Sequence, residues 1–277
     1  MKTWFITGSS RGLGLEIARA ALTAGDQVVA TARASKRVEE ALTGYGDKLL
    51  PLTLDVTDVA QAEAAVAAAK QRFGRIDVLV NNAGFAQLGA FEEISHAEIE
   101  QQFATNVFGT FHVTRAVLPM MRAQRAGHVI TISSSVGIMG YEGSSIYCSG
   151  KFALEGWSES LVQELAPFGI KATLVEPGMF CTDFLDAASA RHGSIVIEDL
   201  AESSAKRREM LASFNHQQPG DPKKLATAML KLANAQEPPA RLPIGSDSVG
   251  AFLAKADMLR AQAEQWHDVS TSTDRAA

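Results

Sequence analysis

The sequence predicts an α/β fold: one doubly wound, Rossmann-type domain with a parallel, seven-stranded sheet and helices on both faces. Three observations support this fold class. Between residues 3 and 176, short apolar runs alternate with longer segments of helical periodicity, which is the pattern of repeated βαβ units. These runs are apolar throughout, as in strands that are buried on both faces. A glycine-rich turn joins the first run to the first helical segment, as in dinucleotide-binding domains.

The predicted elements follow in chain order. Short apolar runs bounded by turn residues predict strands over residues 3–7, 27–31, 49–54, 76–80, 128–132, 171–175 and 241–244. Helical periodicity predicts helices over residues 13–24, 58–73, 97–124, 147–168 and 223–235. Residues 249–266 also carry apolar side chains at helical spacing. We interpret them as a helix packed on the core, with a helix that binds a partner as the alternative.

Residues 1–267 are expected to form this single domain. Within it, the segment 183–218 is long, mixed in charge and only partly helical. A segment of this length between core elements usually has a function, and we expect a mobile lid over the substrate site, with Phe184 and Phe214 on its inner surface. Residues 268–277 are small and polar and are expected to be disordered.

Composition excludes several classes of protein. The net charge is −5 and the basic residues are scattered, so no nucleic-acid-binding surface is expected. No stretch approaches the roughly 18 apolar residues of a membrane span. The two cysteines, Cys148 and Cys181, are too few for a disulfide scaffold and lack metal-ligand spacing, so no metal site is expected. A reduced, cytoplasmic protein is the expectation.

A glycine-rich turn follows the first predicted strand and opens the first predicted helix. Its glycines are Gly8, Gly12 and Gly14. Glycines let the backbone approach a pyrophosphate, and the N-terminus of a helix favours negative charge. The turn therefore predicts a dinucleotide site, with a tight structural turn as the alternative.

Two arginines indicate NADP in preference to NAD. An NAD site usually carries an acid at the end of the second strand, where it binds the ribose 2′-hydroxyl. Ala32 stands there in this chain, Arg33 follows it, and Arg11 lies in the glycine-rich turn. Two guanidinium groups can bind an additional 2′-phosphate. The alternative is that both arginines are solvated surface residues.

Tyr147 and Lys151 are four residues apart, so on a helix their side chains share a face. A phenol beside an ammonium group is an acid whose pKa can fall from about 10 towards the working pH. Such a phenol can give a proton to a carbonyl oxygen. The pair alone is a weak signal, and its value depends on the motifs around it.

In these motifs and their order the chain resembles the short-chain dehydrogenase/reductase family, over residues 3 to about 182. The motifs that carry the resemblance are Thr7–Gly14, Asp55-Val56, Asn81–Gly84, Asn106, Ser134, Tyr147 with Lys151, and Pro177–Thr182. The segment Ser135–Gly140 and the C-terminal extension resemble members near the 17β-hydroxysteroid and retinol dehydrogenases.

The resemblance implies a cofactor site. Asp55 would bind the adenine amine, Thr182 the nicotinamide carboxamide, and Lys151 the nicotinamide ribose. The complete implied set is Gly8, Ser10, Arg11, Gly12, Leu13, Gly14, Arg33, Asp55, Val56, Asn82, Ala83, Gly84, Tyr147, Lys151, Pro177, Gly178 and Thr182.

The resemblance also implies the catalytic residues Asn106, Ser134, Tyr147 and Lys151. Ser134 precedes Tyr147 by 13 residues, as in the family, and Ser135 is the alternative. Ser134 would hold the substrate oxygen, Tyr147 would act as general acid and base, and Asn106 would bind a water that supplies protons through Lys151. Apolar residues expected at the substrate pocket are Val136, Met139, Tyr141, Phe180 and Phe184.

The expected function is an NADP(H)-dependent oxidoreductase that interconverts a carbonyl and a secondary alcohol on a hydrophobic small molecule. Two alternatives remain open: a non-catalytic NADP(H)-sensing regulatory protein, and a sugar-nucleotide epimerase or dehydratase. The resemblance also implies a homodimer or homotetramer that pairs the helices at 97–124 and 147–168. Neither the substrate nor the direction of reaction follows from these residues.

Overall fold

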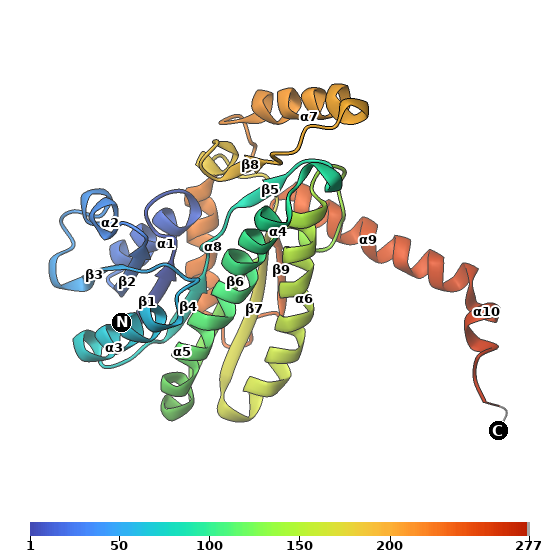
Figure 1. Cartoon of the computed structure of the whole chain (residues 1–277). Coiled ribbons are helices and arrows are strands. Elements are labelled where there is room, and N and C mark those ends of the chain that lie inside the picture. Colours follow the sequence, from blue (N-terminus) through green and yellow to red (C-terminus); the bar gives the residue numbers. More distant parts are fainter. Residues whose placement is uncertain (276–277) are drawn as a thin grey trace.

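The computed structural model describes residues 1–275 and contains the predicted seven-stranded parallel sheet, in the order β3-β2-β1-β4-β6-β7-β9 (Figure 1). Every neighbouring pair in this sheet is parallel. The strands are β1 (Thr3–Thr7), β2 (Gln27–Ala32), β3 (Leu49–Thr53), β4 (Val78–Asn81), β6 (Gly127–Ile132), β7 (Ile170–Pro177) and β9 (Arg241–Ile244). The predicted fold class is confirmed.

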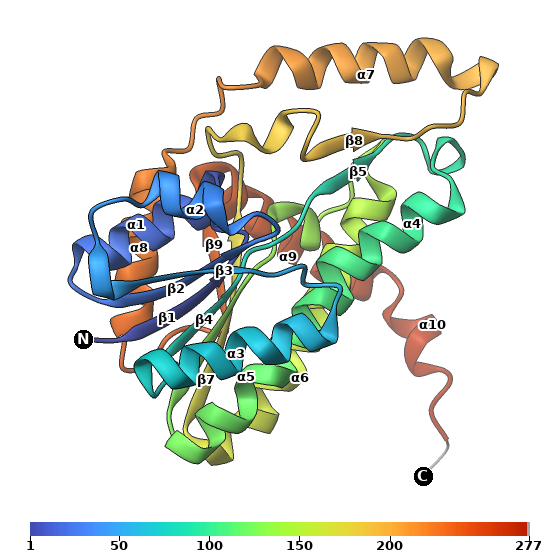
Figure 2. The ribbon, with the colours of Figure 1, turned by 60° about the vertical axis from the view of Figure 1, so that its left-hand side comes forward.

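Helices cover both faces of the sheet because successive strand residues point to opposite sides. Trp4 and Ile6 of β1 pack with α1 and α8, whereas Phe5 packs with α3, α5 and α6 (Figure 2). The helices are α1 (Gly12–Thr23), α2 (Ser35–Ala41), α3 (Val59–Phe73), α4 (His96–Phe103), α5 (Gly109–Gln124), α6 (Ser145–Leu165), α7 (Ala201–Phe214), α8 (Pro222–Asn234), α9 (Ser246–Gln265) and α10 (His267–Thr271). Short 3₁₀ segments lie at Gly46–Lys48, Phe91–Glu93, Ser135–Gly137, Ala166–Phe168, Asp183–Leu185 and Glu198–Leu200.

Local signals account for the ends of several helices. Asp58 caps α3 by accepting a hydrogen bond from Gln61 N at 3.1 Å, and the helix ends at Gly74, whose φ is 75°. Asp221 caps α8 in the same way, and Pro222 occupies the first helical position.

The helix predicted over residues 97–124 is interrupted. A π-helical turn at Ala104–Phe108 separates α4 from α5. Asn106 lies in this turn and is buried. A π turn changes the direction of side chains within a helix and occurs often at functional sites.

The sequence pattern did not predict a second, two-stranded sheet. It pairs β5 (Ala86–Leu88) in parallel with β8 (Ala190–His192). Each strand has only three residues, which is too short for a periodicity signal. This ladder connects the first part of segment 183–218 to the body of the domain, and α7 then lies over the carboxyl edge of the main sheet (Figures 1 and 2).

The prediction that residues 249–266 pack on the core is wrong. Helix α9 projects from the domain (Figure 1), and Ser248 in its first turn is its one buried residue. Ser248 Oγ donates to Glu176 O at 2.6 Å, while Leu253 and Leu259 farther along the helix are exposed. The helix starts at β9, on the edge of the sheet, so it leaves the domain instead of crossing a sheet face.

The tail also differs from its prediction. Residues 267–271 form α10, a single turn held by local hydrogen bonds such as Ser270 N to Trp266 O at 2.9 Å. The structure therefore has a short helix where the sequence predicted disorder at the start of residues 268–277. Residues 276 and 277 lie outside the described residues.

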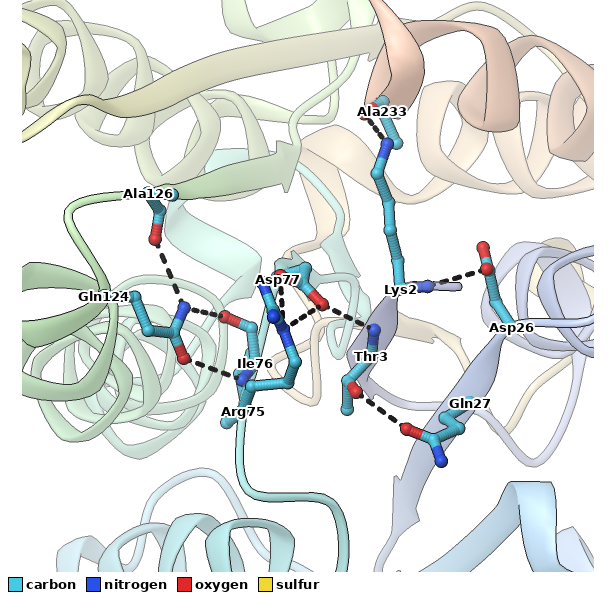
Figure 3. A network of polar contacts seen from close by, with 10 residues as sticks. All are labelled: Lys2, Thr3, Asp26, Gln27, Arg75, Ile76, Asp77, Gln124, Ala126 and Ala233. Atoms are coloured by element: carbon cyan, nitrogen blue, oxygen red, sulfur yellow. Dashed lines mark hydrogen bonds and ion pairs between the residues drawn. The ribbon is translucent and has the colours of Figure 1, made fainter.

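A polar network joins the amino-terminal ends of the strands (Figure 3). Asp77 accepts hydrogen bonds from Thr3 N at 2.8 Å and from Arg75. Lys2 N donates to Asp26 at 2.8 Å, and Gln124 of α5 bonds both backbone groups of Ile76. These contacts hold the edge opposite the strand ends that carry the motifs.

Among the described residues, no helix combines the length and the apolar composition that crossing a bilayer requires.

Candidate active site

A continuous cleft of about 970 Å³ lies at the carboxyl ends of the main strands and brings most of the predicted site residues together. Open α/β sheets bind ligands at this edge. The predicted residues that line it are Gly8, Ser10, Arg11, Gly12, Leu13, Arg33, Asp55, Val56, Asn82, Ala83, Gly84, Asn106, Ser134, Val136, Tyr141, Tyr147, Lys151, Pro177, Gly178, Phe180, Thr182 and Phe184.

Gly14 and Met139 are predicted site residues that do not line this cleft. A Cβ added to Gly14 would lie 2.4 Å from Asn82 Nδ2 and 2.5 Å from Gly8 O. The close packing of the turn therefore requires glycine at position 14. Met139 lies in the turn beyond the 3₁₀ segment of Ser135, and its carbonyl faces Cys148 Sγ instead.

The glycine-rich turn fits a pyrophosphate. Gly8 and Gly12 have φ values of 69° and 57°, a conformation that side chains rarely adopt. A Cβ on Gly8 would lie 2.9 Å from Ala83 Cα, so the turn can approach the loop after β4 only with glycine at this position. Helix α1 has no side-chain cap, which leaves its first N–H groups available to an anion.

The two arginines border the same cleft, but one of them has a partner in the lid segment. Arg11 Nη2 donates to Ser189 Oγ at 2.5 Å. Arg33 is exposed at the end of β2, and the side chain of Ala32 beside it is buried. Asp55 Oδ1 accepts hydrogen bonds from Thr57 N and Oγ1 at 3.0 and 2.7 Å. These two arginines and Asp55 therefore line the cleft together.

Tyr147 and Lys151 lie on one face of α6, as their spacing predicts, and both are buried. Lys151 Nζ donates to Ile132 O at 2.7 Å and lies 5.8 Å from the centre of the Tyr147 ring. Ser134 Oγ donates to Pro177 O at 3.5 Å, and Ser134 is close enough to Tyr147 to affect the pKa of its hydroxyl. The ring of Phe184 packs on that of Tyr147, with 5.9 Å between the ring centres.

Burial controls the pKa values of this pair. It raises the pKa of Tyr147 above the ordinary value, although the nearby Ser134 opposes this shift. It lowers the pKa of Lys151 to about 8, and the charge of Glu155 opposes that shift. The expected fall of the tyrosine pKa is therefore not found, because the cost of removing the phenol from water outweighs the effect of Ser134. At pH 7 the phenol carries its proton.

Asn106 uses both groups of its side-chain amide on one residue. Its Nδ2 donates to Phe85 O at 2.8 Å, and its Oδ1 accepts from Phe85 N at 3.1 Å. The side chain thus holds the loop after β4 next to the cleft. A water bound by this residue would have to use the backbone carbonyl in the π turn.

The segment 183–218, called the lid below, is fastened to the body at several points. Ala86 N donates to Ser189 O at 2.7 Å, and Ser204 Oγ donates to the buried Glu93 at 2.8 Å. Arg207 of α7 forms an ion pair with Glu142. Phe184 lines the cleft as predicted, but Phe214 does not, and Met210 and Leu211 of α7 do so instead.

Two cleft residues gave no signal in the sequence. Arg191 lies 4.4 Å from the centre of the Phe85 ring and donates to Gln101 at 2.9 Å. Gln218 is buried, and its Oε1 has no hydrogen-bond partner among the described residues. Both come from the lid, whose path over the cleft depends on the tertiary structure.

The sheet order, the glycine-rich turn at a helix N-terminus and the cleft at the strand ends define a dinucleotide-binding α/β protein. A family model described as short chain dehydrogenase matches residues 2–193. The chain belongs to this family, whose members bind a nicotinamide cofactor, and it is an oxidoreductase.

Known relatives extend the match over the whole chain. The oxidoreductase BOA17 of Botryotinia fuckeliana is 41% identical over 273 residues, covering 98% of this chain and 99% of that protein. Retinol dehydrogenase 8 of Homo sapiens is 40% identical over 189 residues, covering 66% of this chain and 60% of its own length.

Solved structures show the same fold. A short-chain dehydrogenase from Streptomyces avermitilis has a TM-score of 0.90 and 40% identity, covering 99% of this chain and 100% of its own. The structure of ElxO with NADP bound has a TM-score of 0.72 and 28% identity, covering 87% of this chain and 95% of its own.

Proposed function

We propose that this oxidoreductase uses NADP(H) to interconvert a carbonyl and a secondary alcohol on an apolar small molecule. The observation that carries the proposal is the convergence of Ser134, Tyr147 and Lys151 at one cleft, with Phe184 packed on the phenol. A phenol that burial keeps protonated, beside a second hydroxyl, is a proton donor for a carbonyl oxygen.

The residues take the following roles. The nicotinamide cofactor, when bound, supplies or accepts the hydride. In reduction, the hydroxyls of Ser134 and Tyr147 bind the substrate oxygen, and Tyr147 gives its proton to that oxygen as charge develops there. Lys151 stabilises the tyrosinate that results and binds the nicotinamide ribose, while the turn at Asn106 brings in a water to restore the proton. In oxidation the tyrosinate is the general base.

The preference for NADP is supported by Arg11 and Arg33. Both border the cleft, and Ala32, the last residue of β2, leaves no carboxylate there to bind a ribose 2′-hydroxyl. A guanidinium pair binds a phosphate through charge-assisted hydrogen bonds. Arg11 would exchange its bond to Ser189 for this phosphate, which would connect cofactor binding to the lid.

The proposed substrate is apolar because the side chains around Tyr147 are apolar. Those that line the cleft and come from the serine loop, the strand ends and the lid are Val136, Tyr141, Phe180, Phe184, Leu185 and Leu211. Burial of a hydrocarbon body against such residues contributes about 25 cal/mol per Å² of apolar surface. The reacting carbonyl would be the polar group that orients the ligand.

The decisive experiment measures oxidation of NADPH by the purified chain with a panel of hydrophobic ketones, aldehydes and diketones. We expect turnover of several apolar carbonyl compounds and little turnover of sugar nucleotides. Ser135→Ala is the matched control, because Ser135 is the neighbouring hydroxyl that we do not assign to substrate binding. NADPH binding without turnover of any carbonyl, or retention of cofactor through a full cycle on a sugar nucleotide, would contradict the proposal.

We also propose that the chain forms a homo-oligomer through the outer faces of α5 and α6. Phe108 and Phe152 are 51% and 42% exposed on this side, and Phe111 packs on Trp157 with 4.9 Å between ring centres. Leu154 of α6 is buried and does not contribute to this exposed surface. Sedimentation equilibrium tests the proposal, with Phe152→Glu expected to shift the chain towards the monomer.

A further inference from the structure

A group of buried charges lies one helical turn beyond Lys151. Glu155 of α6 and Glu176 of β7 are 4% and 0% exposed. Arg241, the first residue of β9, joins them, because its Nη1 lies 2.8 Å from Glu155 Oε2 and 3.1 Å from Glu176 Oε1. Two buried carboxyl groups thus share one guanidinium nitrogen, and the roles given above do not explain why they are there.

This carboxyl pair is suited to hold one proton. Among the described residues, Glu176 Oε2 has no hydrogen-bond partner, and Glu155 Oε2 has only its ion pair with Arg241; an ionised carboxylate can only accept. Adjacent buried carboxylates cannot both ionise readily, because desolvation and repulsion add. Burial raises the pKa of both carboxyls, and the neighbouring Glu155 adds to the shift of Glu176, whose pKa is raised to about 8, whereas Ser133 and Arg241 oppose the shift of Glu155. We therefore assign the proton to Glu176 and the negative charge to Glu155, whose Oε1 accepts a hydrogen bond from Ser133.

Glu155 also contacts the loop that carries Ser134. The 3₁₀ turn that follows Ser134 ends at Gly137. A Cβ added to Gly137 would lie 2.5 Å from Glu155 Oε1 and 2.6 Å from Ser133 Oγ. The backbone of the loop therefore lies directly against the carboxylate, and this contact requires glycine.

The same carboxylate acts on Lys151. The two residues are four apart on α6, so they share a face. The charge of Glu155 raises the pKa of Lys151 and so opposes the effect of burial. Other acids nearby are engaged elsewhere: Glu159 is half-exposed and binds Arg241 at 2.7 Å, and Asp247 of α9 accepts from Met179 N at 2.7 Å.

We propose that Glu155 is a positioning residue of the active site: it places a negative charge on the face of α6 that carries Lys151 and holds the Ser134 loop against that helix. Glu176, in its neutral form, and Arg241 hold Glu155 in place. The proposal rests on the function proposed above for Lys151 and Ser134. It extends the site to three residues that come from α6, β7 and β9.

The test measures the protonation of Lys151 directly, by NMR titration of the full chain carrying isotope-labelled lysine side chains, with Lys151→Arg identifying its signal. Glu155→Gln keeps the size of the side chain and an acceptor for Ser133 but removes the charge. We expect the titration midpoint of Lys151 to fall by about one pH unit or more, the effect of losing a close opposite charge. Glu159→Gln is the matched control on the same helix and the same arginine, and it should leave the midpoint unchanged.

Two further measurements separate charge from position. Glu176→Gln replaces a group that we assign as neutral, so the midpoint of Lys151 should stay near that of wild type. Gly137→Ala keeps every charge but moves the Ser134 loop away from Glu155, which keeps its place on α6 beside Lys151. It should lower turnover by roughly tenfold to a hundredfold without moving that midpoint, because a small displacement of a reacting group is costly.

An unchanged Lys151 midpoint in Glu155→Gln would overturn the proposal, and so would an equal shift in Glu159→Gln. If Glu155→Gln does not fold, titration of labelled glutamate carboxyls in the wild type decides: two carboxyls that both ionise at low pH would overturn the assignment of the proton. These titrations need no substrate. Failure of the proposed function would appear separately, as a lack of carbonyl turnover.

Discussion

The pKa values of Tyr147 and Lys151 in the cleft depend more on burial than on their neighbours in the sequence. The spacing of Tyr147 and Lys151 correctly predicts a shared face of α6, but burial raises the pKa of the phenol and lowers that of the ammonium group to about 8. At pH 7 the phenol is protonated and Lys151 is still mostly charged. Both states suit the reductive direction, in which Tyr147 gives a proton. Above pH 8 the loss of charge on Lys151 should remove support for a tyrosinate.

Tyr147→Phe removes the proposed proton donor and leaves the ring in place. We expect turnover to fall by about two or more orders of magnitude, the range for loss of a general acid, while the affinity for NADPH changes little. Steady-state kinetics and fluorescence titration of NADPH measure the two effects. The matched control is Tyr141→Phe, an exposed tyrosine that lines the same cleft. Near-wild-type turnover of a folded Tyr147→Phe protein would remove Tyr147 from the mechanism.

Ala32→Asp combined with Arg33→Ala tests the choice of cofactor. Loss of one charge-assisted contact to phosphate costs about 1.5–3 kcal/mol, and the new carboxylate can bind a ribose 2′-hydroxyl. We expect the ratio of affinities to shift at least tenfold towards NAD, measured by titration of both cofactors. Lys36→Ala, a nearby change in α2 outside the cleft, is the control. Equal affinity of the wild type for NAD and NADP would contradict the proposed preference for NADP.

Short and irregular elements shape the cleft. The β5–β8 ladder fastens the lid at residues 190–192, and the π turn at Ala104–Phe108 turns Asn106 inward. Helix α7 has a single buried residue, Ser204, and lies over the cleft on exposed linkers. The lid is therefore tied to the body by the β5–β8 ladder, by Ser204 and by Arg207, while the rest of α7 is weakly packed, which is the arrangement of an element that opens locally.

Amide hydrogen exchange tests the proposed lid motion. In the free protein we expect slow exchange in β8, because it is paired with β5, and fast exchange in α7. NADPH together with a turned-over substrate should slow exchange in α7 and around Phe184. Helix α8, which packs on the core, is the internal control and should exchange slowly throughout. Strong protection of α7 in the free protein would make the lid a fixed wall.

In the molecule as a whole, the cleft and the stabilising polar contacts lie at opposite ends of the strands. One edge of the sheet carries the cleft, and the other carries the network of Figure 3 and the buried His128. His128 Nε2 contacts Thr173 Oγ1 at 2.9 Å. Burial, with Lys171 and Lys2 nearby, lowers the pKa of His128 to about 4. The neutral imidazole is therefore part of the folded core.

This histidine makes folding sensitive to acid. The folded pKa of about 4 lies below the unfolded value of about 6.5, so between these values the unfolded chain binds more protons and stability falls as the pH falls. We expect His128 to account for about 2 kcal/mol of lost stability between pH 7 and pH 5. Urea unfolding at both pH values measures this loss, which should be smaller in His128→Gln. The exposed His96→Gln should behave as wild type, and equal losses in all three proteins would contradict the prediction.

The sequence by itself determined the main sheet, the glycine-rich turn and the positions of Ser134, Tyr147 and Lys151. Each of these depends on local pattern: an apolar run makes a strand, and the motif after it lies at the carboxyl edge because parallel strands all end there. Met139 and Phe214 do not line the cleft as the sequence predicted. Their directions depend on turns and on the path of the lid, and neither gives a periodic signal in the sequence.

Only the tertiary structure decided which distant segments meet. It paired residues 86–88 with 190–192, sent α9 away from the core, and joined Glu155, Glu176 and Arg241 behind Lys151. Charges and hydrogen bonds between remote residues have no period in the sequence, and burial, which sets their pKa values, exists only once the chain has folded. The pKa values and contacts of the cleft residues therefore depend on the fold, although the residues themselves can be identified from the sequence.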